Sequence, residues 1–249
     1  MEPSIVLAAV VIGYLLGSIS FARIVAARVK PGEDVTSVSV VVGDGHDFTF
    51  RSVSATAVRV KVGRRWGILT GVLDMLKVAL PVLAFSLLYP GEPYALIVAG
   101  AGLVGHDWPI WHRFRGGRGE SVIYGALFVL DPLGAVVTTV AGILIGVLAG
   151  NILAVRWAGM ILVVPWFLVV RDDPAAALWM VFSLALYFLS LRPELVQYIA
   201  MRRTGDPPTN ETISRDLGMG AGLGRTVDRI SIPGLVRRLR SRGQAPSEG

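Results

Sequence analysis

The chain has 249 residues, of which 53% are hydrophobic and only 17% are charged. This composition is unusual for a soluble domain and is typical of a protein with several membrane-spanning segments. The lack of cysteine excludes disulfides, thiolate catalysis and sulfur-ligated metal sites. The net charge of +6 does not indicate nucleic acid binding, because the basic residues flank apolar segments, as in the cytoplasmic loops of membrane proteins.

Apolar segments that would cross or enter a bilayer recur along the whole chain. In chain order they are 4–29, 67–89, 94–111, 121–130, 133–153, 157–170 and 175–191. The sequence therefore predicts an all-α polytopic membrane protein with about seven transmembrane helices, the shorter ones tilted or sheltered by their neighbours. The first segment is a poor signal peptide, because Glu2 stands where positive charge is expected and no small-residue cleavage site follows.

Basic residues gather in alternate loops, which sets the predicted orientation. One set of loops and the tail contain Lys30, Arg51, Arg59, Lys61, Arg64, Arg65, Arg113, Arg115, Arg118, Arg156 and the arginines after Leu191. The opposite loops contain only Arg171, which is followed by Asp172 and Asp173. We therefore predict a multi-pass protein of the cell (plasma) membrane, with its N-terminus outside and its C-terminus in the cytoplasm.

Two segments look as if they lie outside the membrane. Residues 31–62 are predicted to be an inserted cytoplasmic loop in the 1–203 transmembrane domain, with apolar and polar residues alternating around Gly43-Asp44-Gly45, a β-hairpin signal. Residues 204–249 are predicted to be a basic, partly disordered cytoplasmic tail. Its segment 230–242 would either lie on anionic lipid as a short amphipathic helix or remain solvated.

The glycine-dense loop within 105–119 carries the strongest chemical signal. Arg115, Gly116, Gly117, Arg118 and Gly119 lie together where an apolar segment ends. Backbone N–H groups that converge beside a guanidinium bind phosphate, so these residues are a candidate phosphate site. The alternative is a membrane-proximal turn with ordinary positive charge.

Other ionisable residues fall inside or beside the apolar segments. Asp74 and Lys77 are three positions apart, on one face of the second predicted helix, and form a candidate intramembrane pair with a functional or a purely structural role. His106 precedes the glycine loop and is either a helix-end residue or a catalytic group. No spacing of ligands indicates a metal site, and no cofactor is expected.

Several of these stretches together resemble one family. Residues 14–21, 63–82 and 105–119, and more distantly 192–205, resemble the motifs of the PlsY family in order and spacing. The resemblance implies a membrane acyltransferase of phospholipid synthesis that moves a fatty acyl group from acyl-phosphate to glycerol-3-phosphate. It also implies that the glycine loop, in which Arg118 stands where the family usually has lysine, binds the acceptor phosphate.

The sequence departs from the family at positions that the resemblance marks as catalytic. The family's first motif combines a serine, several glycines and the sequence Ala-Thr-Asn, and an arginine follows it. Here only Ala55-Thr56 of the Ala-Thr-Asn part is kept, and Arg59 lies one residue out of register. Ser52 or Ser54 would replace the serine only in a shifted alignment. Ser52, Arg59 and His106 are therefore the tentative catalytic set.

The closing motif of the family differs as well. Leu191 stands at the position of its histidine and Glu194 at the position of its asparagine. Because an acyl-phosphate is an activated donor, proximity and electrostatic stabilisation provide much of the catalysis.

Two hypotheses follow. The first is a membrane acyltransferase whose substrates are acyl-phosphate and glycerol-3-phosphate or a similar phospho-alcohol. The second is a catalytically lapsed homologue that binds an anionic phospho-ligand, a lipid or a protein partner. A transporter is a weaker alternative, since helix-interior charge is limited to little beyond Asp74 and Lys77.

Overall fold

The computed structural model describes residues 1–42, 46–203, 209–216 and 220–243. Within these ranges the chain is helical apart from one two-stranded sheet, which confirms the predicted all-α membrane fold with a small hairpin. The helices are α1 (Pro3–Gly17), α2 (Phe21–Val29), α3 (Ala55–Lys61), α4 (Arg64–Leu88), α5 (Tyr94–Asp107), α6 (Glu120–Leu130), α7 (Pro132–Ala149), α8 (Ile152–Pro165), α9 (Pro174–Arg203), α10 (Asn210–Asp216), α11 (Ala221–Ile230) and α12 (Ile232–Gly243). Two short helical turns are η1 (Ile110–His112) and η2 (Trp166–Val170), and the strands are β1 (Val38–Val42) and β2 (His46–Phe50).

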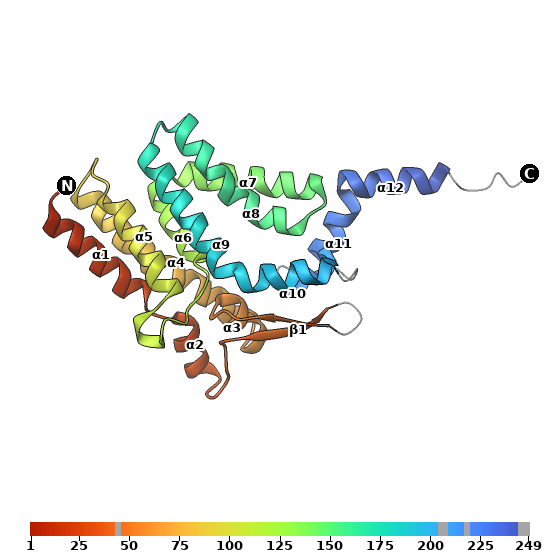
Figure 1. The fold of residues 1–249 in the computed structure, drawn as a ribbon, viewed down its shortest axis with the longest axis horizontal. Coiled ribbons are helices and arrows are strands. Elements are labelled where there is room, and N and C mark those ends of the chain that lie inside the picture. The colour runs from red at the N-terminus through yellow and green to blue at the C-terminus, as the bar shows by residue number, and fades with distance from the viewer. Residues whose placement is uncertain (43–45, 204–208, 217–219, 244–249) are drawn as a thin grey trace, which may run out of the picture.

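Five helical stretches of the described chain are long and apolar enough to cross a membrane. They are Pro3–Val29, Arg64–Leu88, Pro132–Ala149, Ile152–Val170 and Pro174–Met201. The other two predicted segments correspond to α5, with 14 residues, and α6, with 11 residues. In Figure 1, α1, α4 and α5 lie side by side, α7 packs along α8, and α9 contacts both α5 and α8.

Glycine allows α1 and α5 to pack with their backbones in contact. A Cβ added at Gly17 would overlap the main-chain oxygen of Gly102, and one at Gly105 would overlap that of Tyr14. Small residues permit this close approach in membranes, where packing rather than hydrophobic exclusion drives helix association. Ser18 donates its hydroxyl hydrogen to the Tyr14 carbonyl oxygen at 2.8 Å, so its polar group is satisfied within the helix end.

The first and last apolar segments differ from the predicted ones. The first is interrupted near Ser18–Ser20, where α1 ends and α2 begins at a new angle (Figure 1). The last continues as α9 well beyond residue 191, to Arg203. The extension begins with Arg192, Pro193 and Glu194, which end the uninterrupted apolar run, and its Gln197 binds the hairpin.

The hairpin forms in the predicted insertion, with β1 antiparallel to β2 and Val40 opposite Phe48. The predicted turn, residues 43–45, lies outside the described part of the chain. The Gln197 side chain accepts from the Thr49 N–H (3.1 Å) and donates to the Thr49 carbonyl oxygen (3.2 Å). Through these two bonds the α9 extension continues the hydrogen bonding of β2 and fixes the hairpin against the helices.

Asp131 joins α6 to α7 at the far end of the bundle. Its carboxylate accepts two hydrogen bonds from Arg171, both 2.6 Å long, and further ones from the Trp166 indole and the Gly134 N–H. The bonds from Arg171, with smaller contributions from the other donors, lower the pKa of Asp131 to about 2. The loop arginine is therefore held by a carboxylate that stays ionised at any physiological pH.

The tail contains ordered helices. The Asn210 side chain donates to the Gly150 carbonyl oxygen (2.8 Å) and accepts from the Ile152 N–H (3.0 Å), so α10 is bound to the turn between α7 and α8. Val227 of α11 is fully buried. α12 extends away from the bundle (Figure 1) and exposes Leu235 and Leu239. The segment is helical, and its contact with anionic lipid stays a prediction.

Candidate functional site

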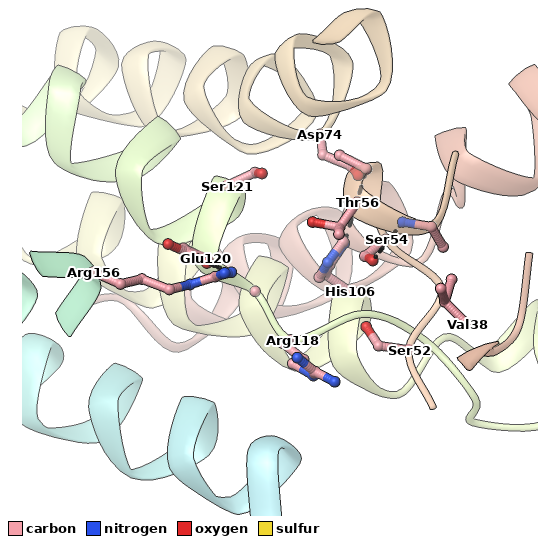
Figure 2. Close-up of a pocket in the computed structure, with 13 residues that line it drawn as sticks. Val38, Ser52, Ser54, Thr56, Asp74, His106, Arg118, Glu120, Ser121 and Arg156 are labelled. Atoms are coloured by element: carbon pink, nitrogen blue, oxygen red, sulfur yellow. Dashed lines mark hydrogen bonds and ion pairs between the residues drawn. The ribbon is translucent and has the colours of Figure 1, made fainter. Parts of the chain in front are cut away.

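A small polar cavity of about 70 Å³ lies where the glycine loop, the start of α6, the start of α3 and the hairpin meet. Figure 2 shows Ser52, His106 and Arg118 gathered around it, with Glu120 and Arg156 together at the α6 side. Its polar lining residues are Ser52, Ser54, Thr56, Asp74, His106, Arg118, Glu120, Ser121 and Arg156. Asp74, His106 and Glu120 belong to the apolar helices α4, α5 and α6. The cavity therefore lies where these helices meet the glycine loop.

The glycine loop is fixed by its own backbone. The Gly117 N–H donates to the His106 carbonyl oxygen at 3.0 Å, and the Gly116 carbonyl accepts from the Val53 N–H at 3.1 Å. A Cβ at Gly116 would overlap the His106 main-chain oxygen, and one at Gly117 would overlap the His106 ring. The glycines thus allow the loop to lie on the end of α5. The Gly117 N–H is used in holding the loop, and Arg118 supplies the positive charge.

Arg118 lines the cavity, and its guanidinium is bound by Glu194 of α9. The two form an ion pair in which only 12% of the Arg118 and 5% of the Glu194 side chain are exposed. Burial lowers the pKa of Arg118, while the nearby Glu194 carboxylate raises it. A guanidinium that has lost its water needs such an anion, from the protein or from a ligand.

A second ionic cluster lies beneath the cavity. Lys77 forms an ion pair with Asp74 (2.8 Å) and donates to the Nδ1 atom of His106 (2.8 Å) and to the Ile19 carbonyl oxygen (2.7 Å). The ammonium is thus held by one carboxylate and two hydrogen-bond acceptors. Since Nδ1 of His106 accepts, the neutral ring carries its hydrogen on Nε2, and His106 is a hydrogen-bond donor in this state and not a base.

Ser52 is the one hydroxyl of the tentative catalytic set. It comes from the segment after β2, is 5% exposed, and its Oγ has no hydrogen-bond partner among the described residues. A buried hydroxyl without a partner costs about 1–3 kcal/mol, so an unsatisfied group facing a cavity indicates a place for a ligand or water.

The structure brings together some of the predicted site residues and separates others. Ser52, His106, Arg118 and Gly119 line the cavity, and so does Asp74. Gly116 and Gly117 line a neighbouring cavity of about 10 Å³ instead.

Two of the predicted arginines do not line the cavity. Arg59 packs under Gly67, where a Cβ would overlap it. Arg115 is exposed, and its carbonyl oxygen accepts from Arg23 at 3.1 Å. Neither arginine lies near the other candidate groups in this state.

Sequence reasoning missed the pair formed by Arg156 and Glu120. Arg156 was assigned to a cytoplasmic loop, but it lies within α8 and forms an ion pair with Glu120 at the first position of α6. The signal that would have found it is a single arginine within an apolar helical pattern, which in a membrane requires a buried partner.

Comparisons with known proteins show to which family the chain belongs. A model of the family described as "Glycerol-3-phosphate acyltransferase" matches residues 7–200. The chain belongs to this family. The glycerol-3-phosphate acyltransferase fold thus includes both the glycine loop and the α9 extension that holds Glu194.

Individual relatives agree with this assignment. A glycerol-3-phosphate acyltransferase of Anaeromyxobacter sp. (strain K) is 37% identical over 127 residues, covering 49% of this chain and 58% of the relative. That of Aquifex aeolicus is 33% identical over 124 residues, covering 49% and 58%. The match thus spans a little over half the length of these curated relatives.

Solved structures of the family show the same fold. A crystal structure of PlsY, an integral membrane glycerol 3-phosphate acyltransferase, in its glycerol 3-phosphate form is 25% identical to this chain, with a TM-score of 0.64. The similarity covers 81% of this chain and 94% of that one. The lysophosphatidic acid form is 24% identical with the same TM-score.

Proposed function

We propose that this protein is a membrane acyltransferase that moves a fatty acyl group from acyl-phosphate to glycerol-3-phosphate or a similar phospho-alcohol. The observation that carries the proposal is the convergence of Arg118, Ser52 and His106 on one polar cavity within the family fold. In the reaction the acceptor oxygen bonds to the acyl carbonyl carbon, and the bond from that carbon to the phosphate oxygen breaks. The hydroxyl proton leaves with inorganic phosphate, so no protein base is required.

Each residue has a role in this scheme that suits its surroundings. Arg118 would bind the acceptor phosphate through a charge-assisted hydrogen bond. Ser52 and the Nε2–H of His106 are neutral donors for ligand oxygens, including the oxygen on which negative charge develops during transfer. Lys77 would orient His106 through Nδ1 and does not itself line the cavity.

The test is lysophosphatidate formation by purified protein from palmitoyl-phosphate and glycerol-3-phosphate. We expect Arg118→Ala to lower kcat/KM by about 10²-fold or more, because a buried charged contact to the substrate is lost. Arg225→Ala, which removes an exposed arginine paired with Glu211, is the matched control and should change little. Failure of the wild-type protein to acylate glycerol-3-phosphate or any other phospho-alcohol would refute the proposal.

A second candidate function is binding without turnover. It is favoured by the position of Arg59, which lies away from the cavity, and by the carboxylate partners of the cavity arginines. Such a homologue would bind an anionic phospho-ligand or lipid, with affinity that falls with salt and on Arg118→Ala. The acylation assay separates the two candidates directly.

The orientation in the membrane is also a proposal, with the N-terminus outside and the tail in the cytoplasm of the cell. Because the chain lacks cysteine, single cysteines report it without background labelling. On intact cells an impermeant maleimide should label Glu92→Cys, in the exposed turn between α4 and α5, and not Thr226→Cys, on the exposed side of α11. The reverse labelling pattern would place the glycine loop outside and contradict the assigned topology.

A further inference from the structure

Glu194 stands out among the charged groups near the cavity because its hydrogen bonding is incomplete. Its Oε1 atom accepts from Arg118 and from the Arg51 N–H at 3.0 Å. Its Oε2 atom is buried and has no hydrogen-bond partner among the described residues. A buried carboxylate oxygen without a donor is costly, so this carboxylate is held mainly by the charge of Arg118.

Among the described residues, both arginines that line the cavity, and Lys77 beneath it, are paired with carboxylates of the protein. Arg118 is bound by Glu194, Arg156 by Glu120, and Lys77 by Asp74. The charges within these pairs cancel, so an arriving phosphate finds no net positive charge there. A phosphate bound to Arg118 would lie beside the Glu194 carboxylate, and like charges repel strongly in a protein interior.

Of these carboxylates, Glu194 is the one paired with the arginine of the glycine loop. The Asp74 pair is fixed by the further bonds from Lys77 to His106 and Ile19, deep between α4 and α5. Glu194 lies on α9, its side chain is 5% exposed, and it does not line the cavity itself. The cavity of about 70 Å³ has room for only a few water molecules, so some group must move before a phospho-alcohol enters.

We propose that Glu194 competes with the ligand phosphate for Arg118, so that the protein rests in a self-paired state and binds phosphate only when this carboxylate is displaced. Glu194 would thereby set the affinity for the anionic substrate. The inference rests on the proposed function for the identity of the ligand, a phosphomonoester. Its test needs only inorganic phosphate.

Glu194→Gln should raise the affinity for inorganic phosphate by at least about tenfold. The amide oxygen still accepts from the Arg51 N–H, while the charge that neutralises Arg118 is lost. The measurement is the melting temperature of the purified protein in detergent at increasing phosphate concentration. A chloride salt keeps the ionic strength constant, and the buffer contains no sulfate. Without phosphate the variant should melt below the wild type, and phosphate should raise its melting temperature much more, because ligand that binds only the folded state stabilises it.

Two further variants make the result decisive. Glu211→Gln removes a carboxylate from an exposed pair with Arg225 and should behave as the wild type does. Glu194→Asp keeps the negative charge but places it one methylene farther from Arg118, so its phosphate affinity should lie between those of the wild type and Glu194→Gln. This variant also tests the proposal if the glutamine variant does not accumulate. Equal or weaker phosphate binding by both Glu194 variants would overturn the proposal and assign Glu194 to positioning Arg118.

The outcome is separable from that of the proposed function. Tighter phosphate binding by Glu194→Gln without acyl transfer by either protein would support the competition and refute the acyltransferase. Acyl transfer by the wild type, with unchanged phosphate affinity in Glu194→Gln, would support the acyltransferase and refute the competition.

Discussion

Lys77→Met should be one of the most destabilising single substitutions in this protein, costing about 3–5 kcal/mol, because it leaves the Asp74 carboxylate buried without its counter-charge. The two side chains are 2% and 4% exposed, so neither is solvated at the protein surface. The measurement is the melting temperature of the purified protein in detergent or nanodiscs, together with the yield of folded protein.

The double variant Asp74→Leu, Lys77→Met is the control for this prediction. Replacing a buried ion pair by apolar side chains of similar size is often neutral or stabilising, so most of the lost stability should return. A double variant as unstable as Lys77→Met would mean that the ammonium matters mainly for His106 and the Ile19 carbonyl oxygen, which it also binds. Phosphate binding retained by the double variant would assign the pair a structural role.

Gly116→Ala should abolish acyl transfer, lowering kcat/KM by about 10²-fold or more while the helices remain folded. The added Cβ would overlap the His106 main-chain oxygen and lie 2.6 Å from the Pro109 Cδ atom. The loop would have to move away from the end of α5, and a displacement of about 1 Å at a catalytic group is enough for a loss of this size. The measurement is the acylation assay, with circular dichroism to confirm the helical content.

Gly71→Ala is the matched control for the loop substitution. Its Cβ would lie 3.6 Å from that of Ala55, an ordinary contact, and alanine favours the α4 helix. This variant should retain wild-type activity. Equal activity of Gly116→Ala and Gly71→Ala would show that the position of the loop does not limit the reaction.

The membrane fold could be predicted from the sequence because hydropathy is a local property. The apolar segments correspond to helices, the first of them to α1 and α2 together, and the alternating pattern before Ala55 forms the predicted strands. The part of α9 beyond residue 191 escaped prediction, and so did the contacts of its Glu194 and Gln197 with Arg51 and Thr49. Such contacts leave no periodic pattern in the residues themselves.

The candidate site could be predicted only where its residues are close in sequence. His106 and Arg118 belong to one loop and its preceding helix, so their proximity follows from local structure. The pairing of Arg156 with Glu120 joins residues 36 positions apart, and that of Arg118 with Glu194 joins residues 76 apart. Arg59 is predicted at the site because it lies one residue from the position of the family's arginine. In the structure its place on α3 puts it against Gly67 instead.

The bonds between the hairpin and α9 have a consequence for the order in which the protein is made. Gln197 and Thr49 are 148 positions apart in the chain. A ribosome adding about 5–20 residues per second therefore completes the hairpin roughly 7–30 s before its partner helix exists. During that interval the earlier spans are already entering the membrane, and the wall formed by Ser52 has no support from α9. The cavity therefore gains the contacts of α9 only late in synthesis, when most of the membrane segments have already been made.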